Sequence, residues 1–278
     1  MEVRVLMTGR QGQLTRRANA CRPSPAARGF SLFDLLVSVV VIAVLLSIML
    51  PVLAHATEAS RRVACRSNVR QMAISVAMYA EDNLGVIPES EFASGDTPDT
   101  FRPEAMNILN AGKGPGDWEG LGWLYADEYL RTPTLFYCPS HRGEHGFSEY
   151  EAAWLASDVA IVGNYHMRAI TSTRYLAQMP KSMALIADGM RTMQDFNHQI
   201  GSNVARVDMS VEWVADENGL LADALPVAAS DSDEDSEAIA RAWFILDNGN
   251  DEQFPGLPWR PLPGFEGHDT NAGFQFPH

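Results

Sequence analysis

The chain has 278 residues, 46% of them hydrophobic, and a formal net charge of −14, which suits one membrane segment and one globular domain. Residues 1–29 contain six arginines and one glutamate, a formal charge of +5, and this leaves −19 for the remainder. A domain with that much negative charge repels phosphate groups, so nucleic acid is not an expected partner.

Residues 28–54, RGFSLFDLLVSVVVIAVLLSIMLPVLA, contain a run long enough to cross a membrane. From Leu35 to Leu53 the polar residues are Ser38 and Ser47, and a helix of this length covers about 30 Å of hydrocarbon. The run continues into a further helical pattern rather than a small-residue cleavage site, so we expect the mature protein to keep it. The basic residues before it predict a cytoplasmic N-terminus, with the acidic remainder on the other side of the membrane.

An aspartate, Asp34, stands near the start of this apolar run. A charged carboxylate inside a bilayer costs about 2.5–3.5 kcal/mol on insertion scales, so a partner or a role for Asp34 is expected. The alternative is that Asp34 lies close enough to the interface to reach the lipid headgroups.

The segment GFSLFD, residues 29–34, resembles the N-terminal motif of type IV pilins and type II secretion pseudopilins. A basic leader precedes Gly29, Phe30 follows it, an acidic residue is fifth after the cleavage point, and Pro51 matches the family's proline at the twenty-second position. The resemblance implies cleavage after Gly29 by a prepilin peptidase, methylation of Phe30, and pairing of Asp34 with the amino terminus of a neighbouring subunit. The family usually has glutamate where this chain has Asp34, which is one methylene shorter.

Beyond Pro51 the helical pattern continues to about Asn83, with apolar residues at three- and four-residue spacings. Pro51 lacks an N–H group, so a kink or a local opening of the helix is expected there. We therefore divide the chain into a removed leader (1–29), a transmembrane helix (30–54), its continuation (55–84) and an acidic globular domain with an irregular C-terminal tail (85–278).

The globular part has the order of an α+β fold, a long helix followed by short helices and a small antiparallel sheet. Residues 85–117 are predicted to form a long loop, residues 118–130 a helix, and residues 132–141 an extended segment. Short strands are expected at Met183–Ala187, Val204–Val207 and Val211–Val214. The acidic run Ser230–Glu237 is interpreted as a solvated loop that leads into a short helix.

Two of the three cysteines, Cys65 and Cys138, fall on the exported side, where disulfides form. They could make one bridge or remain as two buried thiols, because spacing alone does not show whether their α-carbons come close enough.

Three further features resemble a pseudopilin-like subfamily with a C-terminal His-x9-Asp-Gly element: FYCPSH (136–141), ALIADG (184–189), and His198 followed by Asp208 after nine residues. Met209 stands where that element has glycine, so the turn between two strands could differ. We expect His198 and Asp208 to form a hydrogen bond that bridges a hairpin, with a role as ligands as the alternative. No nucleophile is evident beside them.

Metal binding is left undecided by the sequence. Cys138, His141 and His145 have spacings compatible with zinc, yet a structural site needs four ligands. Calcium is better motivated, because the runs Asp247–Glu252 and Ser230–Glu237 are rich in oxygen ligands and major pseudopilins often bind calcium in a C-terminal loop. Solvated acidic loops are the alternative reading of both runs.

The function predicted from these features is that of a structural subunit rather than an enzyme. The resemblance implies a single-pass protein of the inner membrane, with its C-terminal domain periplasmic or extracellular, that polymerises with its own copies or with other pseudopilins. Its expected partners are the prepilin peptidase, an inner-membrane assembly platform and membrane lipid. The alternatives are a true type IV pilin used in adhesion, motility or DNA uptake, and a membrane-tethered ligand-binding protein or enzyme.

Overall fold

The computed structural model describes residues 31–90, 108–112, 114, 116–155, 159–168, 175–228 and 233–250. The chain divides into two units after Val52, and each is described by itself. Gly29 and Phe30, the residues at the predicted cleavage point, lie outside the described residues, as does the tail from residue 251.

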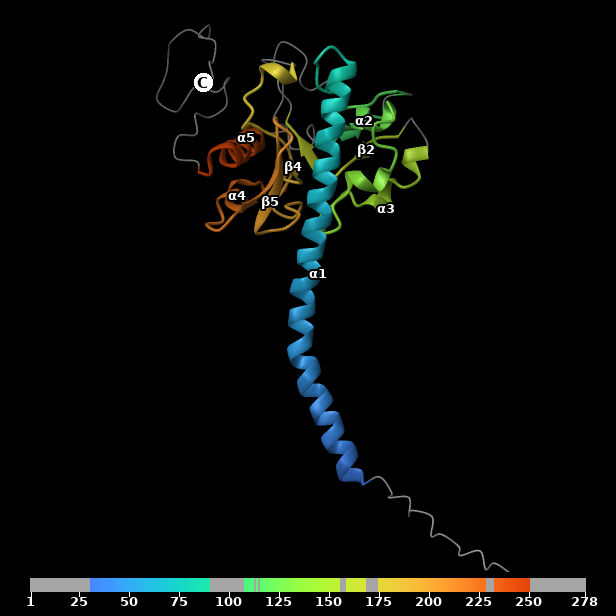
Figure 1. Cartoon of the computed structure of the whole chain (residues 1–278), viewed down its shortest axis with the longest axis vertical. Coiled ribbons are helices and arrows are strands. Elements are labelled where there is room, and N and C mark those ends of the chain that lie inside the picture. The colour runs from blue at the N-terminus through green and yellow to red at the C-terminus, as the bar shows by residue number, and fades with distance from the viewer. Residues whose placement is uncertain are drawn as a thin grey trace, which may run out of the picture. The chain divides into compact units, whose positions relative to one another are not determined.

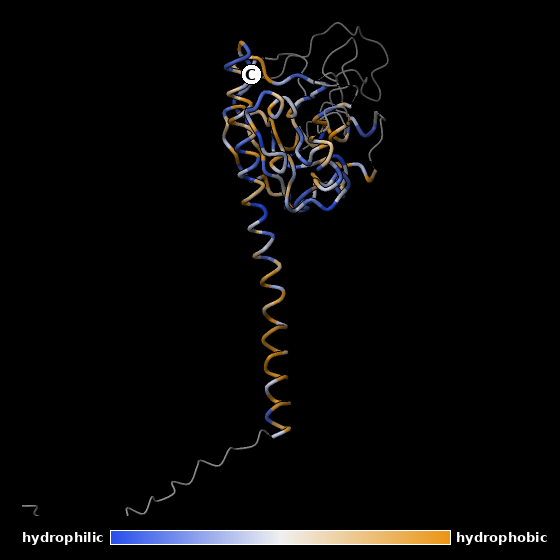
Figure 2. Tube along the Cα trace, turned by 90° about the vertical axis from the view of Figure 1, so that its right-hand side faces the viewer, coloured by the Kyte–Doolittle hydropathy of each residue, from blue (hydrophilic) through white to orange (hydrophobic). Residues whose placement is uncertain are grey.

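The first unit contains the start of helix α1, Leu32–Asp82, which is 51 residues long. Its apolar side chains from Leu32 to Leu53 are exposed, and its most hydrophobic window of 18 residues has no buried residue. Among the described residues, α1 is the one helix long and apolar enough to cross a membrane. Figure 2 shows this apolar stretch along the first half of the helix. The helix continues without interruption through Pro51, where a kink or a local opening was expected.

The second half of α1 belongs to the globular unit and carries a buried stripe. Cys65, Val69, Met72, Val76 and Tyr79 recur at three- and four-residue spacings, which places them on one face of the helix. The helix ends as predicted: Asn83 follows it directly, and the N–H of Gly85, at a φ of 85°, bonds the carbonyl of Ala80.

A four-stranded antiparallel sheet in the order β3-β4-β5-β6 forms the centre of this unit (Figure 1). Its strands are β3 (Tyr165–Met167), β4 (Ala184–Asp188), β5 (Gly201–Arg206) and β6 (Val211–Ala215). A separate pair joins β1 (Ile108–Asn110) to β2 (Ile161–Val162). The α+β prediction and the strands β4, β5 and β6 are confirmed, whereas β1, β2 and β3 were not predicted.

Two hydrophobic clusters flank the four-stranded sheet. The first joins the buried stripe of α1 to Leu185 and Ile186 of β4, together with the segments between residues 109 and 154. The second joins Ala184, Ala187 and Val204 to helices α4 (Leu220–Ala224) and α5 (Asp233–Asn248), with Trp243 fully buried. The sheet therefore packs against α1 on one side and against α4 and α5 on the other.

Three local predictions need correction. Residues 118–130 form a 3-10 turn, Gly120–Gly122, and a single helical turn α2, Trp123–Ala126, rather than one helix. Gly122 lies so close to the Leu109 carbonyl that a Cβ there would be 1.8 Å from its oxygen, so packing against β1 sets this backbone. Residues 133–136 form a 3-10 turn rather than an extended segment, and α5 begins inside the acidic run, where negative charge favours a helix N-terminus.

The first calcium candidate, Asp247, has a structural role at the end of α5. One carboxylate oxygen accepts a 2.7 Å hydrogen bond from the Ala184 N–H at the start of β4, and the other pairs with the Arg168 guanidinium at 2.5 Å. Both Arg168 and Asp247 are largely buried. Residues 251 and 252 of the same run, and residues 230–232 of the other run, lie outside the described residues.

We predict that Asp247→Ala lowers the free energy of unfolding by about 1–3 kcal/mol, because it leaves a buried N–H and a buried guanidinium without their acceptor. Thermal unfolding of the detergent-solubilised full chain would measure this. Glu128→Ala is the matched control, since its 2.7 Å pair with Arg131 is exposed and its loss should cost under about 1 kcal/mol. Equal effects of the two substitutions would contradict this role for Asp247.

Candidate functional site

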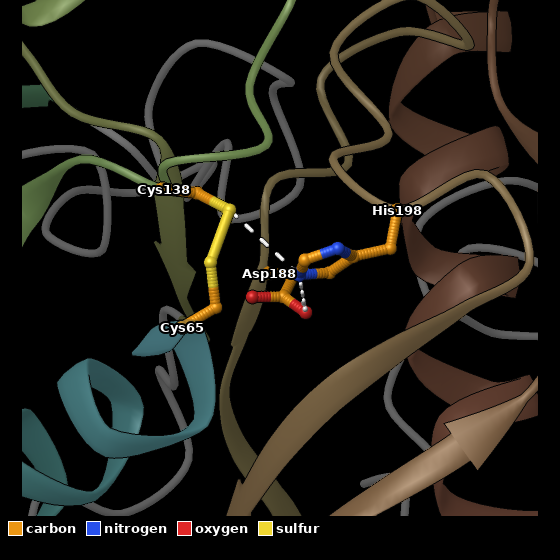
Figure 3. A group of neighbouring side chains, drawn as sticks. All are labelled: Cys65, Cys138, Asp188 and His198. Atoms are coloured by element: carbon orange, nitrogen blue, oxygen red, sulfur yellow. Dashed lines mark hydrogen bonds and ion pairs between the residues drawn. A yellow bond between two sulfur atoms is a disulfide. The ribbon is translucent and has the colours of Figure 1, made fainter. Parts of the chain in front are cut away.

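The candidate site is a cluster of Cys65, Cys138, Asp188 and His198, four residues that lie far apart in the sequence (Figure 3). Cys65 is on α1, Cys138 follows the 3-10 turn Pro133–Phe136, Asp188 ends β4, and His198 lies in the segment between β4 and β5. All four are buried, and one ligand atom of each lies within 4.8 Å of the others.

A disulfide joins Cys65 to Cys138, with their α-carbons 5.6 Å apart. The sequence left open whether these cysteines form a bridge or remain two buried thiols, and the structure has the bridge. It closes a segment of 73 residues and attaches α1 to the start of the loop at Pro139. The Ser140 N–H is directed at Cys138 Sγ at 3.4 Å.

His198 is fully buried and its two ring nitrogens have different surroundings. Nδ1 lies 2.8 Å from a carboxylate oxygen of Glu58, which also accepts a 3.0 Å hydrogen bond from the Ser140 hydroxyl. Nε2 lies 3.5 Å from Asp188 Oδ2 and 3.7 Å from Cys138 Sγ. Glu58 precedes Cys65 by seven residues, or about two helical turns, so both reach the same region from one face of α1.

Asp188 is held at the end of β4 by Asn203 of β5. Oδ2 accepts hydrogen bonds from the Asn203 backbone N–H at 2.6 Å and from its side-chain amide at 2.9 Å. Oδ1 is buried and has no hydrogen-bond partner among the described residues. Burial raises the pKa of Asp188 to about 6, against the opposing effects of His198 and Asn203.

The Glu58 carboxylate behaves differently because it is only partly buried. Its burial alone would raise the pKa, but the hydrogen bonds from His198 and Ser140 lower the pKa of Glu58 below its ordinary value. Glu58 is therefore the carboxylate that stays ionised next to the imidazole, and Asp188 is the one whose charge burial disfavours.

The predicted pair of His198 with Asp208 is wrong. Six residues of β5 separate the segment that holds His198 from the turn that holds Asp208. Asp208 is exposed and accepts a 2.9 Å hydrogen bond from the Ser210 N–H, within the β5–β6 turn. Met209 adopts a φ of 64° in that turn, which is a left-handed conformation that glycine adopts most easily. Met209 stands at the position where the His-x9-Asp-Gly element has its glycine.

Cys138, His141 and His145, whose spacings are compatible with zinc, do not converge. His141 Nδ1 lies 2.7 Å from Asn197 Oδ1 and its Nε2 2.5 Å from the Glu144 carbonyl. His145 Nδ1 lies 2.5 Å from the Tyr150 hydroxyl. Both imidazoles thus have hydrogen-bond partners outside the cluster, and Cys138 is bonded to Cys65.

An open depression of about 320 Å³ lies beside the cluster but touches it at Cys138 alone. It is lined by Thr134, Tyr137, Cys138, Pro139, His141, Gly146, Phe147 and Asn164. His198 and Asp208 do not line it. A cleft with these two residues beside a nucleophile would have favoured a tethered enzyme, but the two residues lie at opposite ends of β5 and the His198 side chain is buried.

Near the start of α1, Asp34 takes part in a helix cap. The Phe33 N–H donates to the Ser31 hydroxyl, and the Ser31 N–H donates to Asp34 Oδ2, both at 3.3 Å. This reciprocal arrangement is a variant of the capping box, with aspartate in place of the usual glutamate and with the N-cap hydroxyl bonded to the N–H of Phe33 rather than to that of Asp34. Asp34 is exposed, so its carboxylate remains accessible to a second partner.

Comparison of the chain with family models, curated proteins and solved structures found no match. The architecture itself, a long apolar N-terminal helix followed by a domain with a small antiparallel sheet, is consistent with pilin-like proteins.

Sequence reasoning missed Glu58, Asp188 and Asn203 as members of the site. Asp188 belongs to the ALIADG segment, residues 184–189, but nothing in the sequence assigned it a role. Glu58 is one of several charged residues on the predicted helix and did not stand out among them. The seven-residue spacing from Glu58 to Cys65 is the one signal that could have joined Glu58 to the cysteines.

We predict that Glu58→Ala lowers the free energy of unfolding by about 1–3 kcal/mol, because a fully buried imidazole N–H loses its acceptor. Thermal unfolding of the full chain in detergent would measure the change. Glu81→Ala, which removes an exposed carboxylate from the same helix, is the control and should stay within about 0.5 kcal/mol of the parent. An unchanged stability in Glu58→Ala would show that its bond to His198 contributes nothing.

Proposed function

We propose that the chain is a pseudopilin-like structural subunit of a type II secretion system or a related filament, rather than an enzyme. In this proposal a prepilin peptidase cuts after Gly29, the first half of α1 anchors the subunit in the inner membrane, and the same helix later packs against other subunits. The acidic domain faces the periplasm or the exterior.

The observation that carries the proposal is the division of α1 into two surfaces. From Leu32 to Leu53 large apolar side chains are exposed on all sides, over a length of about 33 Å. From Cys65 onwards one face of the same helix is buried in the domain. An apolar surface of that extent is unfavourable in water, so lipid or the helices of other subunits must cover it.

Charge supports the direction of insertion. The +5 of residues 1–29 opposes translocation, while the strongly acidic remainder does not. The acidic domain also disfavours a direct contact with DNA, which supports a pseudopilin over a pilin used in DNA uptake.

The cluster at His198 supports a structural role. Both cysteines are bonded to each other, and the Nε2 of His198 is enclosed rather than directed at a cleft. A catalytic centre would need an accessible nucleophile next to its base.

The first test is the intact mass of the membrane-extracted protein. We expect the loss of residues 1–29 and one methyl group added to Phe30. Gly29→Val should leave the precursor uncut, because a side chain at the cleavage point obstructs the peptidase, whereas Ala27→Val in the same leader should be processed normally. A chain that begins at Met1, or one cut near residue 54, would remove the basis of the proposal.

The second test separates the two roles of Asp34, the helix cap and the pairing with a neighbouring amino terminus. Asp34→Ala and Asp34→Asn should both be inserted and processed, yet crosslinking between neighbouring copies in the membrane should fall strongly. The reason is that a buried ammonium without its counter-charge costs several kcal/mol. Asp34→Glu retains the charge and should crosslink at least as well as the parent.

Ser38→Ala is the control for this series, since the Ser38 hydroxyl donates to the Leu35 carbonyl of its own helix. Parental crosslinking in Asp34→Asn would show that the charge is dispensable and that Asp34 acts as a cap. Parental crosslinking in Asp34→Ala would show that neither role matters for assembly.

A further inference from the structure

We propose that the chain binds one Zn²⁺ through Cys65, Cys138, Asp188 and His198 when its two cysteines are reduced. The zinc form and the disulfide form then exclude each other. This inference concerns the globular unit alone and does not depend on whether the chain assembles into a filament.

The spacing of the cluster fits tetrahedral zinc. With bond lengths of about 2.0–2.3 Å, the ligand atoms of such a site lie about 3.3–3.8 Å from one another. His198 Nε2 already lies 3.7 Å from Cys138 Sγ and 3.5 Å from Oδ2 of the Asp188 carboxylate, whose other oxygen, Oδ1, is the one left free to bind a metal. All four ligand atoms lie within 4.8 Å of one another, and the two sulfur atoms, which are bonded in the structure, would have to move apart to reach such a distance.

An unpaired oxygen of Asp188 also points to a cation. Oδ1 is buried and lacks a hydrogen-bond partner among the described residues, while Oδ2 is held by Asn203. A buried carboxylate that is only half satisfied is costly, and a metal ion between it and the sulfurs would neutralise it. Figure 3 shows the Asp188 carboxylate between the disulfide and the imidazole.

The groups around the four ligands hold them as metal ligands are usually held. Glu58 accepts at His198 Nδ1, which fixes the ring so that Nε2 faces the cluster, the carboxylate–histidine arrangement found around zinc. The Ser140 N–H, directed at Cys138 Sγ, would stabilise a thiolate there.

The donor set selects the metal. Two thiolates and an imidazole disfavour calcium and magnesium, which prefer oxygen, and favour a borderline ion such as Zn²⁺. Four protein ligands leave no open position, so the ion would be structural rather than catalytic. Its charge of +2 would offset most of the −3 from two thiolates and one carboxylate.

The chemistry balances without a reductant, because the chain is synthesised as the dithiol. Zinc binding to that form releases two thiol protons and forms two Zn–S bonds. Conversion to the Cys65–Cys138 disulfide instead removes two electrons and two protons. Thiol–disulfide exchange with an oxidising disulfide, which is itself reduced to a dithiol, supplies that oxidation.

The direct test uses the full chain in detergent with Cys21→Ser, which removes the leader thiol. After reduction by a phosphine and removal of the reductant, Zn²⁺ alone is added and the bound metal is measured per chain. We expect one equivalent in the reduced protein and none in the disulfide form. Co²⁺ in place of Zn²⁺ should give the intense visible bands of tetrahedral thiolate coordination.

A measurement without ligand variants keeps the test valid if substitutions disturb folding. Because Cys65 and Cys138 are buried, iodoacetamide should alkylate them in the reduced, metal-free protein through transient openings of the fold, and zinc should slow this reaction at both positions by at least tenfold. Equal alkylation rates with and without zinc would overturn the proposal.

Variants then identify the ligands. Cys65→Ser, His198→Ala and Asp188→Asn should each weaken zinc binding by more than tenfold, and Glu58→Gln by about 10–100-fold. His145→Ala is the matched control, since His145 bonds to Tyr150 outside the cluster, and its affinity should be unchanged. No stoichiometric zinc in the reduced parent, or an equal loss in His145→Ala, would show that these four residues are not a zinc site.

Discussion

The packing of the α1 stripe against the sheet is the contact on which the globular unit depends. Cys65, Val69, Met72 and Val76 are fully buried, and they share one hydrophobic cluster with Leu185 of β4. The second half of the helix is therefore an integral part of the hydrophobic core. Because this contact fixes the rotation of α1, it also fixes where the side chains of Glu58 and Cys65 arrive, and both the disulfide and the bond to His198 follow from it.

The same helix has to satisfy two environments, and its composition changes between them. Up to Leu53 it is apolar on all sides, whereas from Glu58 onwards charged and buried residues alternate with the helical period. A helix that is apolar all round needs lipid or other apolar helices as its surroundings. The cap formed by Ser31 and Asp34 adds a polar group at the N-terminal end of this apolar stretch.

The elements that sequence reasoning located are those with a strong local period. The long helix, its end near Asn83 and the strands β4 to β6 all have apolar patterns that need no distant partner to be recognised. The errors lie where tertiary packing decides the backbone. Gly122 fits against the Leu109 carbonyl only in a tight turn. The strands β1 and β2 are so short that each depends on its pairing with the other. No local pattern encodes either contact.

The candidate site shows why a fixed spacing is a weak guide to contact. Nine residues separate His198 from Asp208, and β5 occupies most of them, so the two side chains belong to opposite ends of a strand. The register of β5 on β4 matters more, because the antiparallel pairing of Val204 with Ala187 places the preceding residue, Asn203, beside Asp188. Asp188 in turn faces His198 Nε2 across the cluster. The partners of His198 therefore come from a neighbouring strand, β4, and from α1 instead of from the β5–β6 hairpin itself.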